Sequence, residues 1–545
     1  MKDFRARFYR TRLDVKFFLF VLFIVLCTGL VACDSSDGSN SRPESSENRE
    51  RSESSERSED SERSESSERS ESSERSESSE RSEDSERSED GERSEDGERG
   101  ESGESDAEPA SDAPDASELG GSRPLNACAR ATSDLSAVER DADIAATKRN
   151  MRPLVSYNAQ KNTIILEEGR DVTLSQIRDV LDEDEGAVKS GLEAPAALLE
   201  EVAPGEWLLS AHLLINKKAS VRIASPEVHW LKLGSDKRGF SWIKVRGGTL
   251  EFFDTCVTSW NSKEEAYDQN VEDGRSFVLA RDGARMNIYN SELSYLGYPA
   301  GESYGVALRL AGTSGDIIDS TFGYNYYGLY SFEASGLVIV GNEVHHSVQY
   351  GIDPHTNSNQ LLIEDNLSHH NGKHGIILAE GCSSSIIRNN ETHNNTLHGI
   401  VIYQKSNNNW IEGNTSYANG KQGININNSS QNTIRDNTVF DNTDAGIGVG
   451  IGATDNLVIN NQSHDNKRDG IYIFNKSNKN TIESNSVYQN TRYGIYIKSE
   501  KNTVKNNDVF SNLVGIYLKL QKPSTISLAN NDVYDNRRGE TKIDK

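Results

Sequence analysis

Two regular spacings in this chain predict an all-β fold, a right-handed parallel β-helix built from coils of about 24 residues. Glycines recur at steps of 23 or 24 residues, and most of them open a Gly-Ile or Gly-Leu strand, at Gly328, Gly351, Gly375, Gly399, Gly423, Gly446, Gly470 and Gly494. Asparagines follow a second spacing of 22 to 24 residues, at Asn342, Asn366, Asn390, Asn414, Asn437, Asn461, Asn485 and Asn507. A repeat of this length is one supersecondary unit that buries its apolar face only by stacking on its neighbours.

Each coil is expected to supply three short strands, with glycine and asparagine at the corners. Identical asparagines that stack can hydrogen-bond from one coil to the next, as in other stacked strands. Leucine-rich repeats fit less well because their leucine consensus is missing, and propeller blades need about 40 residues. Because coils rise about 4.8 Å each, residues one repeat apart should lie side by side.

The N-terminal 33 residues have the features of an export signal. Six basic residues precede the apolar run 17–26, and the segment ends in Leu-Val-Ala-Cys at Cys33. A basic start, a short apolar core and a small-residue site are typical of a secretory signal, and the last four residues resemble a bacterial lipobox. We therefore expect a lipoprotein signal peptide over 1–33, with Cys33 lipidated and the protein held in the periplasm at the inner or outer membrane.

Residues 34–120 consist almost entirely of Ser, Glu, Asp, Arg and Gly, with an arginine every six residues from Arg51 to Arg99. So few apolar side chains cannot offset the entropy of ordering, so we expect a disordered tether. This segment carries 32 acidic and 11 basic residues, whereas 121–545 carries 51 and 42, so most of the net charge of −26 belongs to the tether. The mild acidity of the remainder argues against nucleic acid as a partner.

The rest of the chain is expected to divide into three parts. Residues 121–204, rich in Ala, Glu and Asp, should form a partly helical N-terminal cap, 205–520 the β-helix, and 521–545 a C-terminal cap or tail. The cysteines after the tether, Cys128, Cys256 and Cys382, lack metal-like spacing. We expect them to be buried thiols, with one bridged pair as the alternative, and we expect neither a metal nor a cofactor.

One coil departs from the others, at the hexapeptide Tyr-Gly-Ile-Asp-Pro-His of residues 350–355. Asp353 and His355 are two apart on a strand, so both point to the same face, and a neighbouring Asp can fix the tautomer of an imidazole. Pro354 between them is tolerated only where its missing N–H costs little. Tyr350, just before the glycine corner, is a second candidate proton carrier.

The repeat superimposes residues that are far apart in the sequence. Polar and aromatic side chains thereby gather on one face over about four coils, which suits an extended polymer better than a small metabolite. The column two places after the glycine holds Tyr330, Asp353, Ile377 and Val401, the column four places after it holds Arg309, Phe332, His355, Ala379 and Tyr403, and the column just before it holds Tyr304, Tyr327, Tyr350, His374, His398 and Gln422. The nearby cations are Lys373, Lys405 and Arg309.

These residues resemble the mannuronan C5-epimerases, the alginate epimerases, and in particular their periplasmic branch. The likeness starts from the hexapeptide, covers roughly 205–518, and includes residues 294–298, 303–306, 326–330, 338–342 and 373–377. The resemblance implies an enzyme that converts β-D-mannuronate to α-L-guluronate in alginate by removing and returning the C5 proton. It also implies polymannuronate or alginate as the partner, no cofactor, a periplasmic location, and work beside a polysaccharide secretion complex.

The same resemblance implies roles for individual residues. His355 would be the base, Asp353 would orient it, and Tyr350 or a water would donate a proton from the opposite face. Lys373 or Arg309 would neutralise the substrate carboxylate. The remaining substrate-binding candidates are Tyr327, Tyr330, His374, His398 and Glu380.

Two departures from the family pattern bear on activity. The residue after Asp-Pro-His is usually acidic in the family, and here it is Thr356. The periplasmic branch has an arginine shortly after the His-Gly-Ile-Ile strand, where this chain has Ala379 and Glu380. The secreted, calcium-dependent branch has a carboxylate near that place, which makes Glu380 a substrate-binding candidate.

Two other functions fit the same features. An enolate-like intermediate that expels the 4-O-linked sugar would make the protein a polyuronate lyase acting by β-elimination. A tethered, non-catalytic polysaccharide-binding β-helix is the alternative from another class, and Thr356 with the missing arginine favours it.

Overall fold

The computed structural model describes residues 152–183, 197–520 and 522–544. The expected signal peptide 1–33 with Cys33, the tether 34–120 and much of the expected cap 121–204 lie outside these residues. Among the residues described, no helix has both the length and the apolar character needed to cross a membrane.

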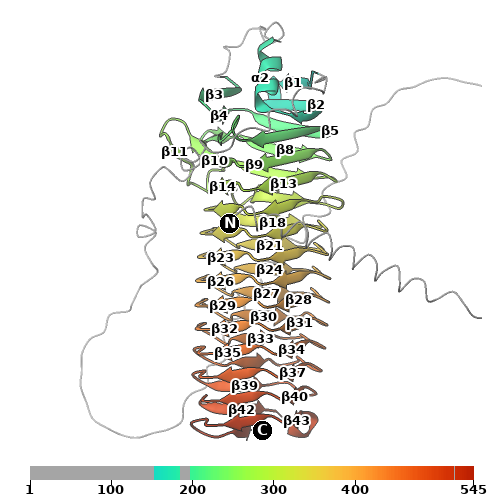
Figure 1. Cartoon of the computed structure of the whole chain (residues 1–545), viewed down its shortest axis with the longest axis vertical. Coiled ribbons are helices and arrows are strands. Elements are labelled where there is room, and N and C mark those ends of the chain that lie inside the picture. Colours follow the sequence, from blue (N-terminus) through green and yellow to red (C-terminus); the bar gives the residue numbers. More distant parts are fainter. Residues whose placement is uncertain (1–151, 184–196, 521, 545) are drawn as a thin grey trace, which may run out of the picture. The chain divides into compact units, whose positions relative to one another are not determined.

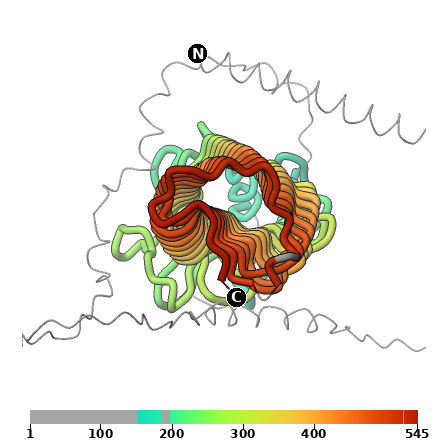
Figure 2. The backbone as a smooth tube through the Cα atoms, turned by 90° about the horizontal axis from the view of Figure 1, so that it is seen from below, coloured from blue at the N-terminus to red at the C-terminus, as the bar shows by residue number. Residues whose placement is uncertain are grey.

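The described residues stack into a right-handed parallel β-helix, as predicted (Figure 1). Each regular coil contributes three short strands, and each strand pairs in parallel with its counterpart in the next coil. Seen along the axis, successive coils superimpose on one cross-section (Figure 2). Three ladders of strands therefore run the length of the stack, and side chains of one column lie one coil apart.

The strands are grouped here by ladder. The first ladder, which contains the repeating glycines or follows them, comprises β8 (Trp242–Arg246), β12 (Phe277–Arg281), β15 (Gly305–Arg309), β18 (Tyr327–Phe332), β21 (Ile352–His355), β24 (Ile376–Ala379), β27 (Ile400–Tyr403), β30 (Ile424–Asn427), β33 (Ile447–Val449), β36 (Ile471–Ile473), β39 (Tyr493–Ile497), β42 (Val514–Lys519) and β45 (Thr541–Asp544). The second comprises β9 (Thr249–Phe253), β13 (Arg285–Tyr289), β16 (Asp316–Ile318), β19 (Val338–Val340), β22 (Leu362–Glu364), β25 (Ile386–Arg388), β28 (Trp410–Glu412), β31 (Thr433–Arg435), β34 (Leu457–Ile459), β37 (Thr481–Glu483), β40 (Thr503–Lys505) and β43 (Ser527–Ala529). The third comprises β6 (Trp230–Asp236), β10 (Cys256–Asn261), β14 (Glu292–Ser294), β17 (Thr321–Gly323), β20 (Glu343–His345), β23 (Leu367–His369), β26 (Glu391–His393), β29 (Thr415–Tyr417), β32 (Thr438–Phe440), β35 (Gln462–His464), β38 (Ser486–Tyr488), β41 (Asp508–Phe510) and β44 (Asp532–Tyr534).

The first coils are less regular and carry a short helix. The remaining elements are β1 (Leu154–Asn158), β2 (Thr163–Val172), α2 (Leu174–Glu183), β3 (Leu199–Ala203), β4 (Glu206–Leu209), β5 (His212–Ala224), β7 (Gly239–Phe240), β11 (Ala266–Tyr267) and two 3-10 turns at Ala159–Lys161 and Pro523–Thr525. The helix α2 buries Leu174, Ile177 and Val180. Spacings of three residues place these side chains on one face, and all three belong to the apolar core of the stack. The helix lies at the N-terminal end of the stack (Figure 1).

The interior is built from columns of identical apolar residues. The position after the repeating glycine is fully buried in seven successive coils, at Ile352, Ile376, Ile400, Ile424, Ile447, Ile471 and Ile495. β-branched side chains suit such a stack because they pack well on a pleated surface. The glycines are required by the close approach of coils, since a Cβ on Gly375 would lie 2.7 Å from the carbonyl oxygen of Gly399.

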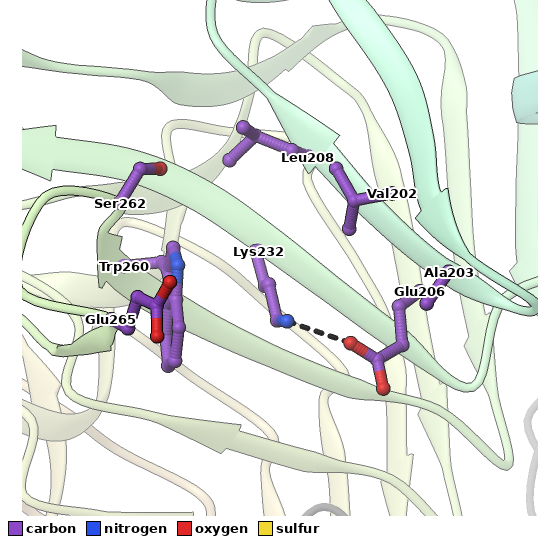
Figure 3. Close-up of a pocket in the computed structure, with 8 residues that line it drawn as sticks. All are labelled: Val202, Ala203, Glu206, Leu208, Lys232, Trp260, Ser262 and Glu265. Atoms are coloured by element: carbon purple, nitrogen blue, oxygen red, sulfur yellow. Dashed lines mark hydrogen bonds and ion pairs between the residues drawn. The ribbon is translucent and has the colours of Figure 1, made fainter.

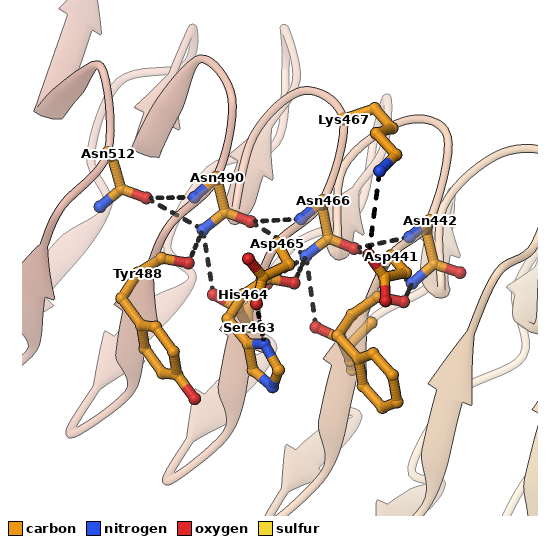
Figure 4. A network of polar contacts seen from close by, with 12 residues as sticks. Asp441, Asn442, Ser463, His464, Asp465, Asn466, Lys467, Tyr488, Asn490 and Asn512 are labelled. Atoms are coloured by element: carbon orange, nitrogen blue, oxygen red, sulfur yellow. Dashed lines mark hydrogen bonds and ion pairs between the residues drawn. The ribbon is translucent and has the colours of Figure 1, made fainter.

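The predicted asparagine ladder is confirmed. Asn390, for example, donates from its side-chain Nδ2 to Oδ1 of Asn414 at 3.0 Å and accepts from Nδ2 of Asn366 at 2.9 Å. Two further ladders, which were not predicted, run through Asn371, Asn395, Asn419, Asn442, Asn466, Asn490, Asn512 and Asn536 and through Asn409, Asn432, Asn456, Asn480 and Asn502. Figure 4 shows part of the first of these two.

A column of stacked rings lies on the outer side of the third ladder. It runs through His345, His369, His393, Tyr417, Phe440, His464, Tyr488, Phe510 and Tyr534. Neighbouring ring centroids are 4.7 to 5.5 Å apart. Each ring face is covered by the next ring, so the column presents ring edges to solvent.

The cysteines in the described part differ in state. Cys256 is disulfide-bonded, whereas Cys382 is a free, buried thiol. Cys128 lies outside the described residues. Within those residues, no three His, Cys, Asp or Glu side chains are grouped so that they could hold a metal ion.

Candidate active site

The pairing of strands confirms the predicted superposition of columns. Tyr330 pairs with Asp353, and Phe332 with His355, between β18 and β21. Arg309 pairs with Phe332 one coil earlier. The outer face of the first ladder therefore brings Arg309 and His355 into one column, two coils apart, which is about 10 Å.

The column just before the glycine is a stack of rings. Tyr327 lies 5.5 Å from Tyr350, Tyr350 lies 5.2 Å from His374, and His374 lies 5.0 Å from His398, measured between ring centroids. Tyr304 extends this stack by one coil, 4.8 Å from Tyr327 and 4.9 Å from Tyr330. Tyr304 was not among the predicted site residues, although its place in the column was the signal that could have included it.

Pro354 interrupts hydrogen bonding between β21 and β24. The N–H of Ile352 donates to the carbonyl of Gly375, and the next bond of that series would start from residue 354, where proline has no N–H. Pairing between the two strands is accordingly limited to Ile352 and Ile376. The strand that carries Asp353 and His355 is thus tied mainly to the coil before it.

His355 is held from the side by its neighbour in the chain. The imidazole Nδ1 lies 2.8 Å from Oγ1 of Thr356, and that hydroxyl donates to Oε2 of Glu380 at 3.1 Å. Thr356 has a φ of +24°, which lies in the left-handed region that β-branched residues rarely occupy. Strain of this kind gathers at functional sites. In the sequence alone, Thr356 stands out only as a departure from the family pattern and Glu380 only as a substrate-binding candidate.

Asp353 is fully buried on the same strand as His355. Since the hydrogen bond at Nδ1 of His355 goes to Thr356, the orientation of the imidazole by Asp353 stays a prediction. Burial raises the pKa of the Cys382 thiol far above its usual range, and the charges of Asp353 and Glu380 raise it further. Cys382 therefore stays protonated and supports the inner wall of the site, with Sγ 3.1 Å from the carbonyl oxygen of Ala379.

The hydroxyl of Tyr350 is in contact with the ammonium group of Lys373. Nζ of Lys373 donates to the Tyr350 hydroxyl at 3.4 Å and lies 5.1 Å from the centroid of the ring. The guanidinium of Arg309 lies over Phe332 at 4.8 Å. Lys373 is therefore a candidate cation in contact with a candidate proton carrier.

His374 and His398 are buried and share one bonding pattern. Nδ1 of His374 accepts the backbone N–H of His398 at 3.2 Å, and Nδ1 of His398 accepts that of Gln422 at 3.1 Å. Burial lowers the pKa of His398 well below its usual value, and the charges of His374 and Lys421 lower it further. His398 is therefore neutral with its proton on Nε2, so it can donate to a sugar oxygen but brings no positive charge to a carboxylate.

The walls of the site are aromatic and largely closed to solvent. Tyr327, Tyr330 and Phe332 are each only 2% exposed, and Tyr350 is 3% exposed. Their rings pack together on the outer face of the first ladder. Charges at such a place interact more strongly than in water.

A separate hollow of about 430 Å³ lies on the earlier coils (Figure 3). It is lined by residues of β3, β4, β6 and β10 and of the turn that follows β10, and Lys232 forms an ion pair across it with Glu206 at 2.7 Å. None of the predicted site residues lines it. The candidate site is therefore the aromatic face around β18, β21 and β24.

Comparison with known proteins finds relatives that are named mannuronan C5-epimerase. A mannuronan C5-epimerase from Pseudomonas aeruginosa is 33% identical over 182 residues, which are 31% of this chain and 33% of the relative. A mannuronan C5-epimerase from Pseudomonas putida is 32% identical over 340 residues, which are 60% of this chain and 56% of the relative. The matches thus span from a third to just over half of the length of these relatives.

Among solved structures, the periplasmic alginate epimerase AlgG superposes with a TM-score of 0.56 and 22% identity, over 78% of this chain and 99% of that one. At that identity the likeness concerns the fold. The family described as right handed beta helix region matches residues 255–416, 369–509 and 411–538, which together exceed half of the chain. With its stacked glycine and asparagine columns, this chain belongs to the right-handed β-helix family.

Proposed function

We propose that this protein is a mannuronan C5-epimerase that acts on polymannuronate. The observation that carries the proposal is that one coil supplies both a candidate base, His355, and a candidate proton donor, Tyr350, with the cation Lys373 at the donor. The relatives named mannuronan C5-epimerase support the same reaction. The 24-residue coils add a long face on which a polymer can lie.

The chemistry required is the removal of a weakly acidic proton next to a carboxylate. His355 takes the C5 proton, and Tyr350 returns a proton to the opposite face of the same carbon. Lys373 stabilises the negative charge that develops on the carboxylate as the C–H bond breaks. The buried aromatic walls exclude water, which strengthens that interaction.

The other candidates hold the polymer on either side of the reacting sugar. Arg309, two coils before His355, faces the carboxylate of a neighbouring uronate. His374 and His398 donate hydrogen bonds from Nε2 to sugar oxygens. Tyr327 and Tyr330 form the wall beside the reacting residue.

The location proposed is the periplasm. The 33-residue signal with Cys33 and the acidic segment 34–120 would tie the β-helix to a membrane while leaving it free to reach the polymer. A flexible chain of that length spans about 50 Å on average. Polysaccharide secretion proteins are the partners that such an arrangement would serve.

Proton NMR of polymannuronate incubated with the purified protein in deuterated water tests the reaction. Guluronate signals with deuterium at C5 are expected, and His355→Ala should abolish them while leaving the circular dichroism and melting temperature unchanged. Retained turnover in that variant would end the mechanism. Unsaturated chain ends would instead identify a lyase, and an unchanged polymer beside folded protein would identify a binding module.

A further inference from the structure

We infer that Glu380, acting through the hydroxyl of Thr356, is a positioning residue that keeps the proton of neutral His355 on Nδ1 and leaves Nε2 as the basic nitrogen. The arrangement of protons stands on the hydrogen bonds alone. Its catalytic consequence rests on the proposed function.

The inference follows from counting protons along the contact. A threonine hydroxyl has one proton to donate, and a carboxylate can only accept. Because the hydroxyl of Thr356 donates to Oε2 of Glu380 at 3.1 Å, it has only lone pairs left for Nδ1 of His355, 2.8 Å away. Nδ1 must therefore carry a proton, and in a neutral ring Nε2 is then bare and able to accept the C5 proton.

The backbone on both sides of the contact is fixed. Ser358 donates from its hydroxyl to the carbonyl oxygen of His355 at 2.8 Å. The N–H of Asn357 donates to the carbonyl of Glu380, and the N–H of Glu380 donates to the carbonyl of Tyr403, at 2.9 and 3.1 Å. Glu380 is thus clamped between two coils, and the left-handed φ of Thr356 places its hydroxyl between imidazole and carboxylate.

The groups around the His355 imidazole show how Glu380 stabilises the protonated ring. On its own strand lies the buried Asp353, from β18 comes the ring of Tyr330 with its centroid 6.0 Å away, and from the corner after β24 comes Glu380. When His355 accepts a proton it becomes a cation, and a carboxylate reached through one hydroxyl stabilises that cation. Glu380 therefore acts on the base through the Thr356 hydroxyl.

The first test reads the tautomer directly, without activity. The full chain is labelled with ¹⁵N-histidine, and the His355 ring signals are identified at pH 8 by their loss in His355→Gln. The expected spectrum has a protonated Nδ1 and an unprotonated Nε2. A proton on Nε2 would overturn the inference, whether or not the protein epimerises any polymer.

The second test measures turnover on polymannuronate with matched variants. Thr356→Val removes the hydroxyl at constant shape, and Glu380→Gln removes the charge; each should lower kcat by about 10- to 100-fold, because hydrogen bonds to charged groups are of that size, with KM within about 2-fold. Thr356→Ser, which keeps the hydroxyl, should retain turnover. Glu333→Gln is the control, since Glu333 occupies the same corner two coils before Glu380, and its N–H donates to the carbonyl of Thr356 in the coil between them.

A pH profile and a rescue separate positioning from simple support of the fold. Without the negative charge of Glu380 the imidazolium is less stable, so the acidic limb of kcat/KM against pH should move to lower pH in Glu380→Gln. Thr356→Asp, whose carboxylate can accept from Nδ1 directly, should make Glu380 dispensable in the double variant Thr356→Asp/Glu380→Gln. Full turnover with an unmoved limb in both Thr356→Val and Glu380→Gln would refute the inference, whereas an inert wild-type protein with the expected tautomer would refute the proposed function and leave the proton arrangement standing.

Discussion

Lys373 contacts Tyr350 in two ways, through its hydroxyl and over its ring. If Lys373 stabilises charge that develops only in the transition state, Lys373→Met should lower kcat by about 10²- to 10³-fold with a smaller change in KM. Arg309, two coils away, would hold a neighbouring uronate equally in ground and transition states. Arg309→Gln should therefore raise KM with kcat nearly unchanged. Steady-state kinetics on polymannuronate measure both.

Lys421 provides the control for the predicted loss of kcat in Lys373→Met. Backbone hydrogen bonds link Lys373 to Leu397 and Leu397 to Lys421, so Lys421 stands at the same corner two coils further on. Lys421→Met removes an equivalent charge away from Tyr350 and should leave kcat as it was. An equal loss in both lysine variants would mean that the effect is general electrostatics and not a contact at the reacting sugar.

Much of the site could be predicted at the residue scale because the repeat fixes which side chains share a column. The pairing of His355 with Phe332 and of Asp353 with Tyr330 follows from counting residues after the glycine. Thr356 and Glu380 are also one repeat of 24 residues apart, so their proximity was foreseeable. Their hydrogen bond was not, because it depends on a left-handed φ that a β-branched residue normally avoids.

At the scale of single ladders, Asn390 shows how much one side chain holds. Its side-chain Nδ2 donates to the carbonyl of Ile363 and to Asn414, and its Oδ1 accepts from the N–H and from Nδ2 of Asn366, at 2.9 to 3.0 Å. Asn390→Ala leaves several buried groups without partners and should lower the free energy of unfolding by about 2–4 kcal/mol. Urea unfolding followed by circular dichroism measures the change.

Thr396→Ala, at an exposed position of the same coil, is the control for Asn390→Ala and should change the free energy of unfolding by less than about 0.5 kcal/mol. Equal effects of the two substitutions would mean that the ladder contributes little beyond the packing of the coil.

Only one of the three asparagine ladders was singled out from the sequence, although the same spacing marks the other two.

The stacked histidines make stability depend on pH. Burial lowers the pKa of His398 well below 6.5. Near pH 6.5, His398 therefore binds a proton in the unfolded chain but not in the folded protein. The free energy of unfolding should therefore fall as pH drops below about 6.5, by up to about 1.4 kcal/mol per pH unit for one such group. His398→Gln, which copies Gln422 of the next coil, should reduce that slope.

The measurement is urea unfolding between pH 7 and pH 5. Thr396→Ala, which changes no titratable group, serves as the comparison and should leave the slope equal to that of the wild type. A slope in His398→Gln equal to the wild-type slope would place the pH sensitivity elsewhere. Burial and the neighbouring imidazoles lower the pKa of His370 too, so part of the slope should remain after the substitution.

For the molecule as a whole, the regular coils were predictable and the first coils were not. From Gly328 onward, fixed glycine and asparagine spacings determine where each strand begins. The glycine spacing reaches back one further step, to Gly305. Before Gly305 it does not repeat, because strands such as β5 (His212–Ala224) extend past a corner and pair with both β8 and β9. The apolar face of α2 depends on contacts with those coils, and such tertiary contacts override local propensity.

The acidic segment 34–120 is predicted to be dispensable for turnover of soluble polymer and for the stability of the β-helix. All candidate catalytic and substrate-binding residues lie between Arg309 and His398 on the stack, so deletion of 34–120 should leave kcat on soluble polymannuronate and the melting temperature unchanged. The same deletion combined with His355→Ala gives the background rate. A large loss of kcat in the deletion alone would place part of the substrate path in that segment.

The contact between Thr356 and Glu380 joins two successive coils, and this gives the proposed reaction a place in the order of folding. Neither coil holds the complete set of groups alone, so the proposed base is complete in a folding chain only once the second coil has docked on the first. Docking of these two coils is thus the folding step that completes the proposed site. The first turnover during refolding would report when one particular coil docks. Circular dichroism and similar global signals cannot report this, because they average the folding of all coils.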